Sequence, residues 1–93
     1  SRINPTRSSK DLINKEIKKL ISSLKIILKF SILKGGSSIR DFKNISGKIG
    51  DFQRFFKVYG KENKNCSRIS CKGIIKRISI SSRSSFYCNI CQK

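Results

Sequence analysis

Histidine and alanine are absent from this 93-residue sequence, and only five residues are acidic. Without histidine, the chain has no Ser-His or Cys-His pair for nucleophilic catalysis. The five carboxylates are scattered singly, so they form no evident pair for general acid–base catalysis. The phosphate-binding motifs of P-loop and dinucleotide-binding proteins are missing as well. The sequence therefore shows no recognisable active site of its own.

Long apolar runs are also absent. The chain has no stretch of about 20 apolar residues, so no segment is predicted to span a membrane. Residues 1–5 have none of the apolar character of a secretory signal. They also lack an initiator methionine, and we expect a fragment whose N-terminal part is missing.

Positive charge is what the sequence has in excess. It contains 22 lysines and arginines against 5 acidic residues, which gives a formal net charge of +17. Such a charge favours a polyanionic partner, either a nucleic acid or an acidic membrane surface. Charge alone does not choose between these two partners.

Cysteine occurs four times, in two close pairs near the end of the chain. The spacing is C-x4-C-x16-C-x2-C, and the residues are Cys66, Cys71, Cys88 and Cys91. Two such pairs, separated by the length of a strand–turn–strand, predict one tetrahedral zinc site with four thiolate ligands. A closed shell of four thiolates leaves no position for water, so we expect a structural zinc. Two disulfides in one of three pairings are the alternative, although nothing in the sequence indicates secretion.

A long helix is predicted over residues 15–34. The residues of one face recur at spacings of three and four, and they are Ile17, Leu20, Ile21, Leu24, Ile27, Leu28 and Ser31. Asn14 is expected to cap the helix, Glu16 suits its first turn, and the glycines after Lys34 are the expected stop. A single helical turn is expected before it, over residues 10–12. An amphipathic core helix is the simplest interpretation, and a membrane-surface helix is the alternative.

The middle of the chain has little periodicity. Residues 44–51 contain two glycines and are expected to form a loop of the kind that often carries binding residues. Aromatic residues then cluster, namely Phe52, Phe55, Phe56 and Tyr59. We expect them to pack the helix against the zinc module, and stacking of one of them on a nucleic-acid base is the alternative.

A hairpin is expected between the two cysteine pairs. Residues 73–80 alternate in part, as in a strand that is covered on both sides. Residues 81–84 are expected to form the turn, and the return strand would start at Ser85. Arg83 lies in this turn, where zinc would fix its direction, and a rigid guanidinium suits bidentate binding of phosphate. A solvated turn residue is the simpler interpretation of Arg83.

Four segments of the sequence together resemble the C-terminal part of formamidopyrimidine-DNA glycosylase (Fpg, MutM). They are residues 35–42 (GGSSIRDF), 47–53 (GKIGDFQ), 58–61 (VYGK) and 83–92 (RSSFYCNICQ). The resemblance covers nearly the whole chain and implies a small α+β fold. Residues 1–56 would be the C-terminal portion of a helix–two-turn–helix domain, and residues 57–93 would be a four-cysteine β-hairpin zinc finger of the FPG type.

Two positions depart from the family pattern. The first cysteine pair has the spacing C-x4-C, where C-x2-C is usual, and Asn89 stands in place of the usual proline of the last knuckle. The two additional residues lengthen the first knuckle without removing a ligand, so zinc is still expected. The asparagine is expected to cost rigidity only.

Members of this family excise oxidised purines such as 8-oxoguanine and formamidopyrimidine, and then cut the abasic strand by β,δ-elimination. Their nucleophile is an N-terminal proline that this chain lacks. The resemblance therefore implies a DNA-binding fragment of a bifunctional DNA glycosylase and AP lyase of base excision repair, inactive by itself. It implies that Arg83 is the proton donor in δ-elimination and contacts DNA, as would Lys48 and Tyr59. Residues 44–55 would form the loop that closes over the everted base.

The resemblance also implies the partners of the protein. These are one structural Zn²⁺ and double-stranded DNA with an oxidised or abasic lesion. A monomer without membrane contact is expected, in the bacterial cytoplasm at the nucleoid. Endonuclease VIII relatives share the finger, but residues 47–52 resemble Fpg more closely. A free-standing zinc-finger module that binds nucleic acid without glycosylase activity is the alternative.

Overall fold

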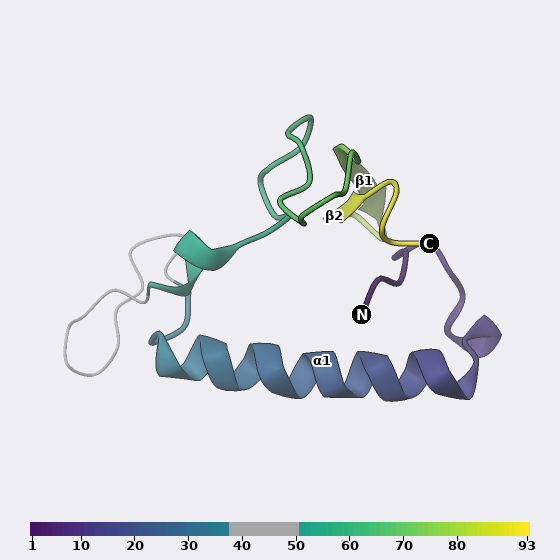
Figure 1. Cartoon of the computed structure of the whole chain (residues 1–93), viewed down its shortest axis with the longest axis horizontal. Coiled ribbons are helices and arrows are strands. Elements are labelled where there is room, and N and C mark those ends of the chain that lie inside the picture. Colours follow the sequence, from purple (N-terminus) through teal and green to yellow (C-terminus); the bar gives the residue numbers. More distant parts are fainter. Residues whose placement is uncertain (38–50) are drawn as a thin grey trace. The chain divides into compact units, whose positions relative to one another are not determined.

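The computed structural model of the chain describes residues 1–37 and 51–93 (Figure 1). The elements in chain order are η1 (Ser9–Asp11), α1 (Asn14–Leu33), η2 (Phe52–Phe55), β1 (Ile75–Ile80) and β2 (Arg83–Cys88). One long helix and one antiparallel hairpin confirm the predicted small α+β fold. The chain forms two compact units, one from Ser1–Ile17 with Lys57–Lys93 and the other from Lys18–Phe56.

The start of α1 differs by one residue from the prediction. Ile13, and not Asn14, is the residue before the helix, since its carbonyl accepts a hydrogen bond from the Ile17 N–H at 3.0 Å. The Glu16 carboxylate, in the first turn as predicted, accepts a hydrogen bond from the Ile13 N–H at 3.2 Å. This is half of a capping box, in which the glutamate satisfies a backbone donor that the helix leaves unpaired. The helical turn predicted over residues 10–12 is present as η1.

The end of α1 is at the predicted glycines. Gly36 donates to the Ser31 carbonyl at 2.8 Å, and Gly35 donates to the Ile32 carbonyl at 3.0 Å. Both glycines have positive φ, 78° at Gly35 and 74° at Gly36. These paired bonds are a Schellman motif, which needs the left-handed backbone that glycine adopts without steric cost.

The apolar face of α1 is present but open. No side chain of the helix is buried, and Ile17, Ile21, Leu24 and Leu28 are exposed. The helix itself is confirmed, and the apolar side chains of this face are exposed in the part of the chain that the structure describes. Within the described residues, no helix combines the length and the apolar character that crossing a membrane requires.

The aromatic residues divide between the two units. Phe30 of α1 meets the rings of Phe52 and Phe55 edge-on, with centroids 5.6 Å and 4.9 Å away. Tyr59 belongs to the other unit, where its ring lies 4.9 Å from that of Phe86 in β2. The expectation that the four aromatic residues between positions 52 and 59 pack the helix against the zinc module stays a prediction. The phenylalanines pack η2 on the end of α1, and the tyrosine packs on the hairpin.

The hairpin has a shorter turn than predicted. β1 and β2 pair from Ile75 opposite Cys88 to Ile80 opposite Arg83, which leaves only Ser81 and Ser82 in the turn. Both serines have positive φ, 50° and 64°, as a type I′ turn requires. Arg83 is thus the first residue of β2 and not a turn residue, and the return strand begins two residues earlier than expected.

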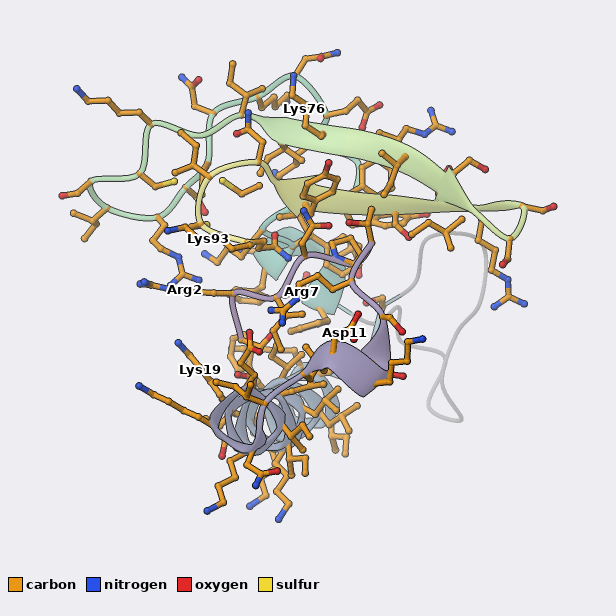
Figure 2. All side chains as sticks on the ribbon, turned by 90° about the vertical axis from the view of Figure 1, so that its right-hand side faces the viewer. Arg2, Arg7, Asp11, Lys19, Lys76 and Lys93 are labelled. Atoms are coloured by element: carbon orange, nitrogen blue, oxygen red, sulfur yellow. The ribbon has the colours of Figure 1, made fainter. Side chains whose placement is uncertain are left out.

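The two ends of the chain meet in one unit. The Asn4 N–H donates to the Lys93 carbonyl at 3.1 Å, and the Lys93 N–H donates to the Arg2 carbonyl at 3.1 Å. Figure 2 shows the side chains of Arg2 and Lys93 next to each other, with Arg7 nearby. Arg7 forms an ion pair with Glu16 and also donates to the Lys93 carbonyl at 3.4 Å. These contacts attach the first residues of the chain to its C-terminal finger.

Candidate metal centre and nucleic-acid interface

The four cysteine sulfurs form one cluster. The Sγ atoms of Cys66, Cys71, Cys88 and Cys91 all lie within 4.8 Å of one another. The distance is 3.6 Å between Cys71 and Cys88 and 3.8 Å between Cys66 and Cys91. A disulfide would require about 2.05 Å, so the four cysteines are free and the disulfide alternative does not hold. Four soft donors at these separations can bind one metal ion.

Gly73 allows the cluster to close. Its N–H donates to the Cys71 sulfur at 3.4 Å, and a Cβ atom at this position would lie 2.3 Å from the Cys88 sulfur. Any other residue here would therefore displace a ligand. The close approach of the Gly73 backbone to two of the sulfurs is an independent indication that the site is shaped to hold an ion.

Asn89 links the two metal-binding turns. Its side-chain oxygen accepts a hydrogen bond from the Ile74 N–H at 2.9 Å, and its own N–H donates to the Ile74 carbonyl at 3.3 Å. A proline in this position could make neither bond. The asparagine, which was expected only to cost rigidity, therefore supplies its own connection between the turns.

Ionisation of the cluster is unequal. Burial opposes ionisation of Cys88, but the backbone N–H groups of Cys91 and Ile90 and the neighbouring thiols outweigh it and lower the pKa of Cys88 to about 6. Burial and the other sulfurs raise the pKa of Cys91 to about 12. The Cys88 thiolate thus forms readily, whereas a bound cation would be needed to stabilise thiolates at the other cysteines as well.

Arg83 is held at the end of the hairpin opposite to the cysteine cluster. β2 runs from Arg83 to Cys88, and at ~3.4 Å per residue these two residues are about 17 Å apart. The arginine side chain is exposed. It pairs with Ile80, and the two residues share one face of the hairpin, because opposed residues lie on the same side of an antiparallel pair.

Tyr59 is on the other face. Its ring packs edge-on against Phe86, which is opposite Arg77 in the strand register and therefore alternates away from the Arg83 face. The tyrosine is 50% exposed. The structure thus places the two predicted DNA-binding residues in one unit but on opposite faces of the hairpin. Lys48, the third of them, lies outside the described residues, as do residues 44–50 of the predicted lesion loop.

Arg77 is a cation that the sequence reasoning did not single out. Its guanidinium lies 5.9 Å from the centroid of the Phe86 ring and donates to the Ser84 hydroxyl from Nε and Nη2. Together with Tyr59, it makes the second face of the hairpin both cationic and aromatic. The strand register could have identified Arg77. A correctly placed turn puts Arg77 opposite Phe86, and this cross-strand pair is then recognisable.

From residue 64 onward, the charge of the finger has one sign. Residues 64–93 contain seven lysines and arginines and no acidic residue, the basic residues being Lys64, Arg68, Lys72, Lys76, Arg77, Arg83 and Lys93. An uninterrupted positive field of this kind attracts polyanions.

Known proteins resemble this chain over nearly its whole length, although no family model matches it. It is 40% identical over 91 residues to the formamidopyrimidine-DNA glycosylase of Ruegeria sp. (strain TM1040). It is 42% identical over 93 residues to that of Roseobacter denitrificans. These matches cover 98% and 100% of this chain but 32% and 33% of the relatives. The chain thus spans about a third of the length of the curated relatives it matches.

Solved structures of Fpg also match nearly the whole chain. The Lactococcus lactis Fpg in complex with DNA containing an abasic site matches 99% of this chain with a TM-score of 0.86 and 36% identity. Its complex with Fapy-dG-containing DNA matches with a TM-score of 0.83 and 35% identity. This chain covers 33% and 32% of those two chains. The chain is therefore a relative of the C-terminal part of the formamidopyrimidine-DNA glycosylases.

Proposed function

We propose that this chain is the DNA-binding, C-terminal part of a bifunctional DNA glycosylase and AP lyase that acts on oxidised purines. One observation carries the proposal. A solved structure of an Fpg in complex with abasic-site DNA matches 99% of this chain with a TM-score of 0.86. At 36% identity, this likeness extends to sequence as well as fold.

Arg83 is the residue proposed to bind the phosphate beside the lesion and to donate a proton in δ-elimination. The geometry supports phosphate binding, since strand pairing with Ile80 holds the backbone of Arg83 and leaves its guanidinium exposed. A base must leave the helical stack before its glycosidic bond can be reached. Holding the flanking phosphates stabilises the DNA in that distorted form. Double-stranded DNA with an oxidised or abasic lesion is thus the proposed partner of a monomeric protein.

Zinc is the proposed metal, as one structural ion. A tetrahedral zinc with bonds of about 2.3 Å keeps its sulfur ligands about 3.8 Å apart. The separations of 3.6 Å and 3.8 Å in the cluster fit this requirement. Cys66, Cys71, Cys88 and Cys91 would hold the ion, whose role is to fix the two turns at the base of the hairpin. With four protein ligands it would have no open position for water, and so no part in chemistry.

The proposal also assigns the residues of the chain to two domains. Residues 1–56 would complete a helix–two-turn–helix domain, with residues 44–55 as the lesion-recognition loop, and residues 57–93 would form the zinc finger. Tyr59 and Lys48 would contact DNA with Arg83. Arg77 would contribute to DNA binding as well, because it places an exposed cation on the face of the hairpin that carries Tyr59. The site of action would be the nucleoid in the bacterial cytoplasm.

The catalytic step is proposed to need residues beyond this chain. The family uses an N-terminal proline as nucleophile, and the one proline here is at position 5. A borohydride trapping assay on duplex DNA with 8-oxoguanine tests this directly. The 93-residue chain is expected to bind the duplex without being trapped, whereas a trapped covalent complex would overturn the assignment.

DNA binding is tested by fluorescence anisotropy with an abasic-site duplex. Arg83→Ala is expected to weaken binding, and Lys72→Ala, the same loss of charge at the cysteine end, is the matched control. Equal effects of the two variants would contradict the role of Arg83. Equal affinity of the unmodified chain for RNA and for abasic-site DNA would instead favour a free-standing nucleic-acid-binding finger.

A further inference from the structure

The cysteine end of the hairpin carries apolar side chains that the protein leaves in solvent. Ile69, in the turn between Cys66 and Cys71, is 92% exposed. Ile90, in the turn between Cys88 and Cys91, is 50% exposed, and Ile74 is 38% exposed. We call these three isoleucines, with Arg68 and Lys72 beside them in the sequence, the knuckle surface. Exposed apolar groups clustered on a rigid element are typical of interaction sites.

The knuckle surface is held in a fixed shape. The N–H of Cys71 donates to the Arg68 carbonyl at 3.1 Å, which closes a tight turn around Ile69. Ser70 accommodates that turn with a positive φ of 65°. The hydrogen bonds between Asn89 and Ile74 then hold the second turn against the residue that precedes β1. A surface ordered before it meets a partner loses less entropy on binding.

The first turn owes its shape to the two additional residues of the C-x4-C spacing. The four residues between the cysteines include both Arg68 and Ile69. Ile69 contributes nothing to the core, because it is the most exposed large apolar residue in the part of the chain that the structure describes. Packing among the described residues therefore does not explain its position.

Charge indicates what kind of partner fits this surface. Arg68 and Lys72 are exposed on either side of Ile69, and the finger has no carboxylate between residues 64 and 93. A complementary partner therefore combines carboxylates with apolar side chains. DNA supplies negative charge, but its backbone offers no apolar groups to an exposed isoleucine.

The knuckle surface is also distant from the proposed DNA contact. The strand β2 separates Cys88 from Arg83 by about 17 Å. A partner at the cysteine end can consequently bind while Arg83 is engaged. The finger would then have two independent sites at its two ends.

We propose that the knuckle surface binds a peptide segment of a partner protein in which aspartates or glutamates flank apolar residues. The isoleucines would receive the apolar side chains, and Arg68 and Lys72 would pair with the carboxylates. This recognition does not depend on DNA or on the glycosylase assignment.

The test uses the zinc-loaded 93-residue chain and two fluorescein-labelled peptides. One alternates leucine with aspartate, and the other alternates leucine with lysine. Binding of the aspartate peptide only is expected, and Ile69→Ser and Arg68→Glu are each expected to weaken it about tenfold, a typical loss for an anchoring contact. No binding of the aspartate peptide, or equal binding of the two peptides, overturns the proposal.

Three controls separate this surface from the rest of the chain. Lys18→Glu makes the same charge change as Arg68→Glu in the other unit and should leave peptide binding unchanged. Arg83→Ala should also leave it unchanged. Ile69→Ser should preserve both zinc content and the affinity for abasic-site DNA. A loss of DNA affinity in Ile69→Ser, with zinc retained, would mean that the isoleucine is a nucleic-acid wedge and would overturn the peptide proposal.

Discussion

Arg77 and Ser84 are joined across the hairpin, with the arginine Nε and Nη2 atoms 3.2 Å and 3.0 Å from the serine Oγ. Ser84 directly follows Arg83 in β2. The bond therefore restrains the backbone next to the proposed phosphate ligand, from the opposite face of the sheet. Arg77 would affect DNA binding in two ways, through its own positive charge and through the hydrogen bonds that hold Ser84 next to Arg83.

Replacing Ser84 separates these two roles. Ser84→Ala removes the acceptor but no charge, and we expect DNA affinity to fall about two- to tenfold, the value of a typical hydrogen bond. Arg77→Ala should weaken binding further and reduce the slope of log Kd against log salt by about one. Anisotropy titrations at several salt concentrations measure both quantities. An altered salt slope in Ser84→Ala would contradict the role given to these hydrogen bonds.

Gly73→Ala is expected to disrupt the metal centre. The added Cβ would lie 2.3 Å from the Cys88 sulfur, so either the ligand or the backbone must move. We expect a loss of at least ~2 kcal/mol in stability, from overpacking and from weaker metal binding. Zinc content by atomic spectroscopy and thermal unfolding report the two effects. Ser67→Ala, at an exposed position in the turn between Cys66 and Cys71, is the control and should retain full zinc content.

Ser82→Gly is expected to stabilise the hairpin. Ser82 has φ of 64°, where an L-residue with a side chain is strained and glycine is not. The expected gain is roughly 0.5–1 kcal/mol, because the relief is partly offset by the greater freedom of glycine in the unfolded chain. Denaturant unfolding of the zinc-loaded protein measures it. Ser79→Gly in β1 should have the opposite sign, and stabilisation by both variants would refute the explanation.

Glu16 should make stability depend on acid pH. The hydrogen bond from Arg7, and then that from the Ile13 N–H, lower the pKa of Glu16 below its usual 4.5. A carboxylate with a lowered pKa in the folded state contributes stability above its unfolded pKa. That contribution is lost as the pH falls through the folded value. The unfolding temperature should therefore fall less below pH ~4.5 in Glu16→Gln than in the parent chain.

The same experiment needs a control for general charge effects. Asp51→Asn removes a carboxylate that pairs with Arg54 in the other unit. It should leave the contribution from Arg7 and Glu16 in place. An identical pH profile for Glu16→Gln and the parent chain would show that the ion pair does not support the fold.

The features that the sequence predicted well are those that local spacing determines. The thiolate cluster followed from the intervals between cysteines, and α1 followed from the three- and four-residue spacing and the glycines behind it. The failures concern choices between local conformations of similar energy. Ser81 and Ser82 are not the Asn-Gly pair that usually marks a two-residue turn, so the turn was placed too wide and Arg83 was put in it.

Contacts between distant segments were the other omission. The ion pair of Arg7 with Glu16 and the attachment of residues 2–4 to the end of the chain have no signature in a single sequence. The four aromatic residues are close together in sequence, but the sequence does not show that Tyr59 contacts Phe86 or that Phe52 and Phe55 contact Phe30. Similarly, the Arg77–Ser84 bond depends on the register that the misplaced turn had concealed.

The side chain of Gln92 connects the start of the chain to the metal centre. The Gln92 side chain donates to the Ile3 carbonyl at 3.1 Å and accepts from the Cys88 N–H at 2.8 Å. A displacement of the first residues would thus reach the backbone of Cys88 through this amide group, in addition to the bonds that Arg2 and Asn4 make with Lys93. The geometry of the sulfur cluster would then respond to movement at the start of the chain.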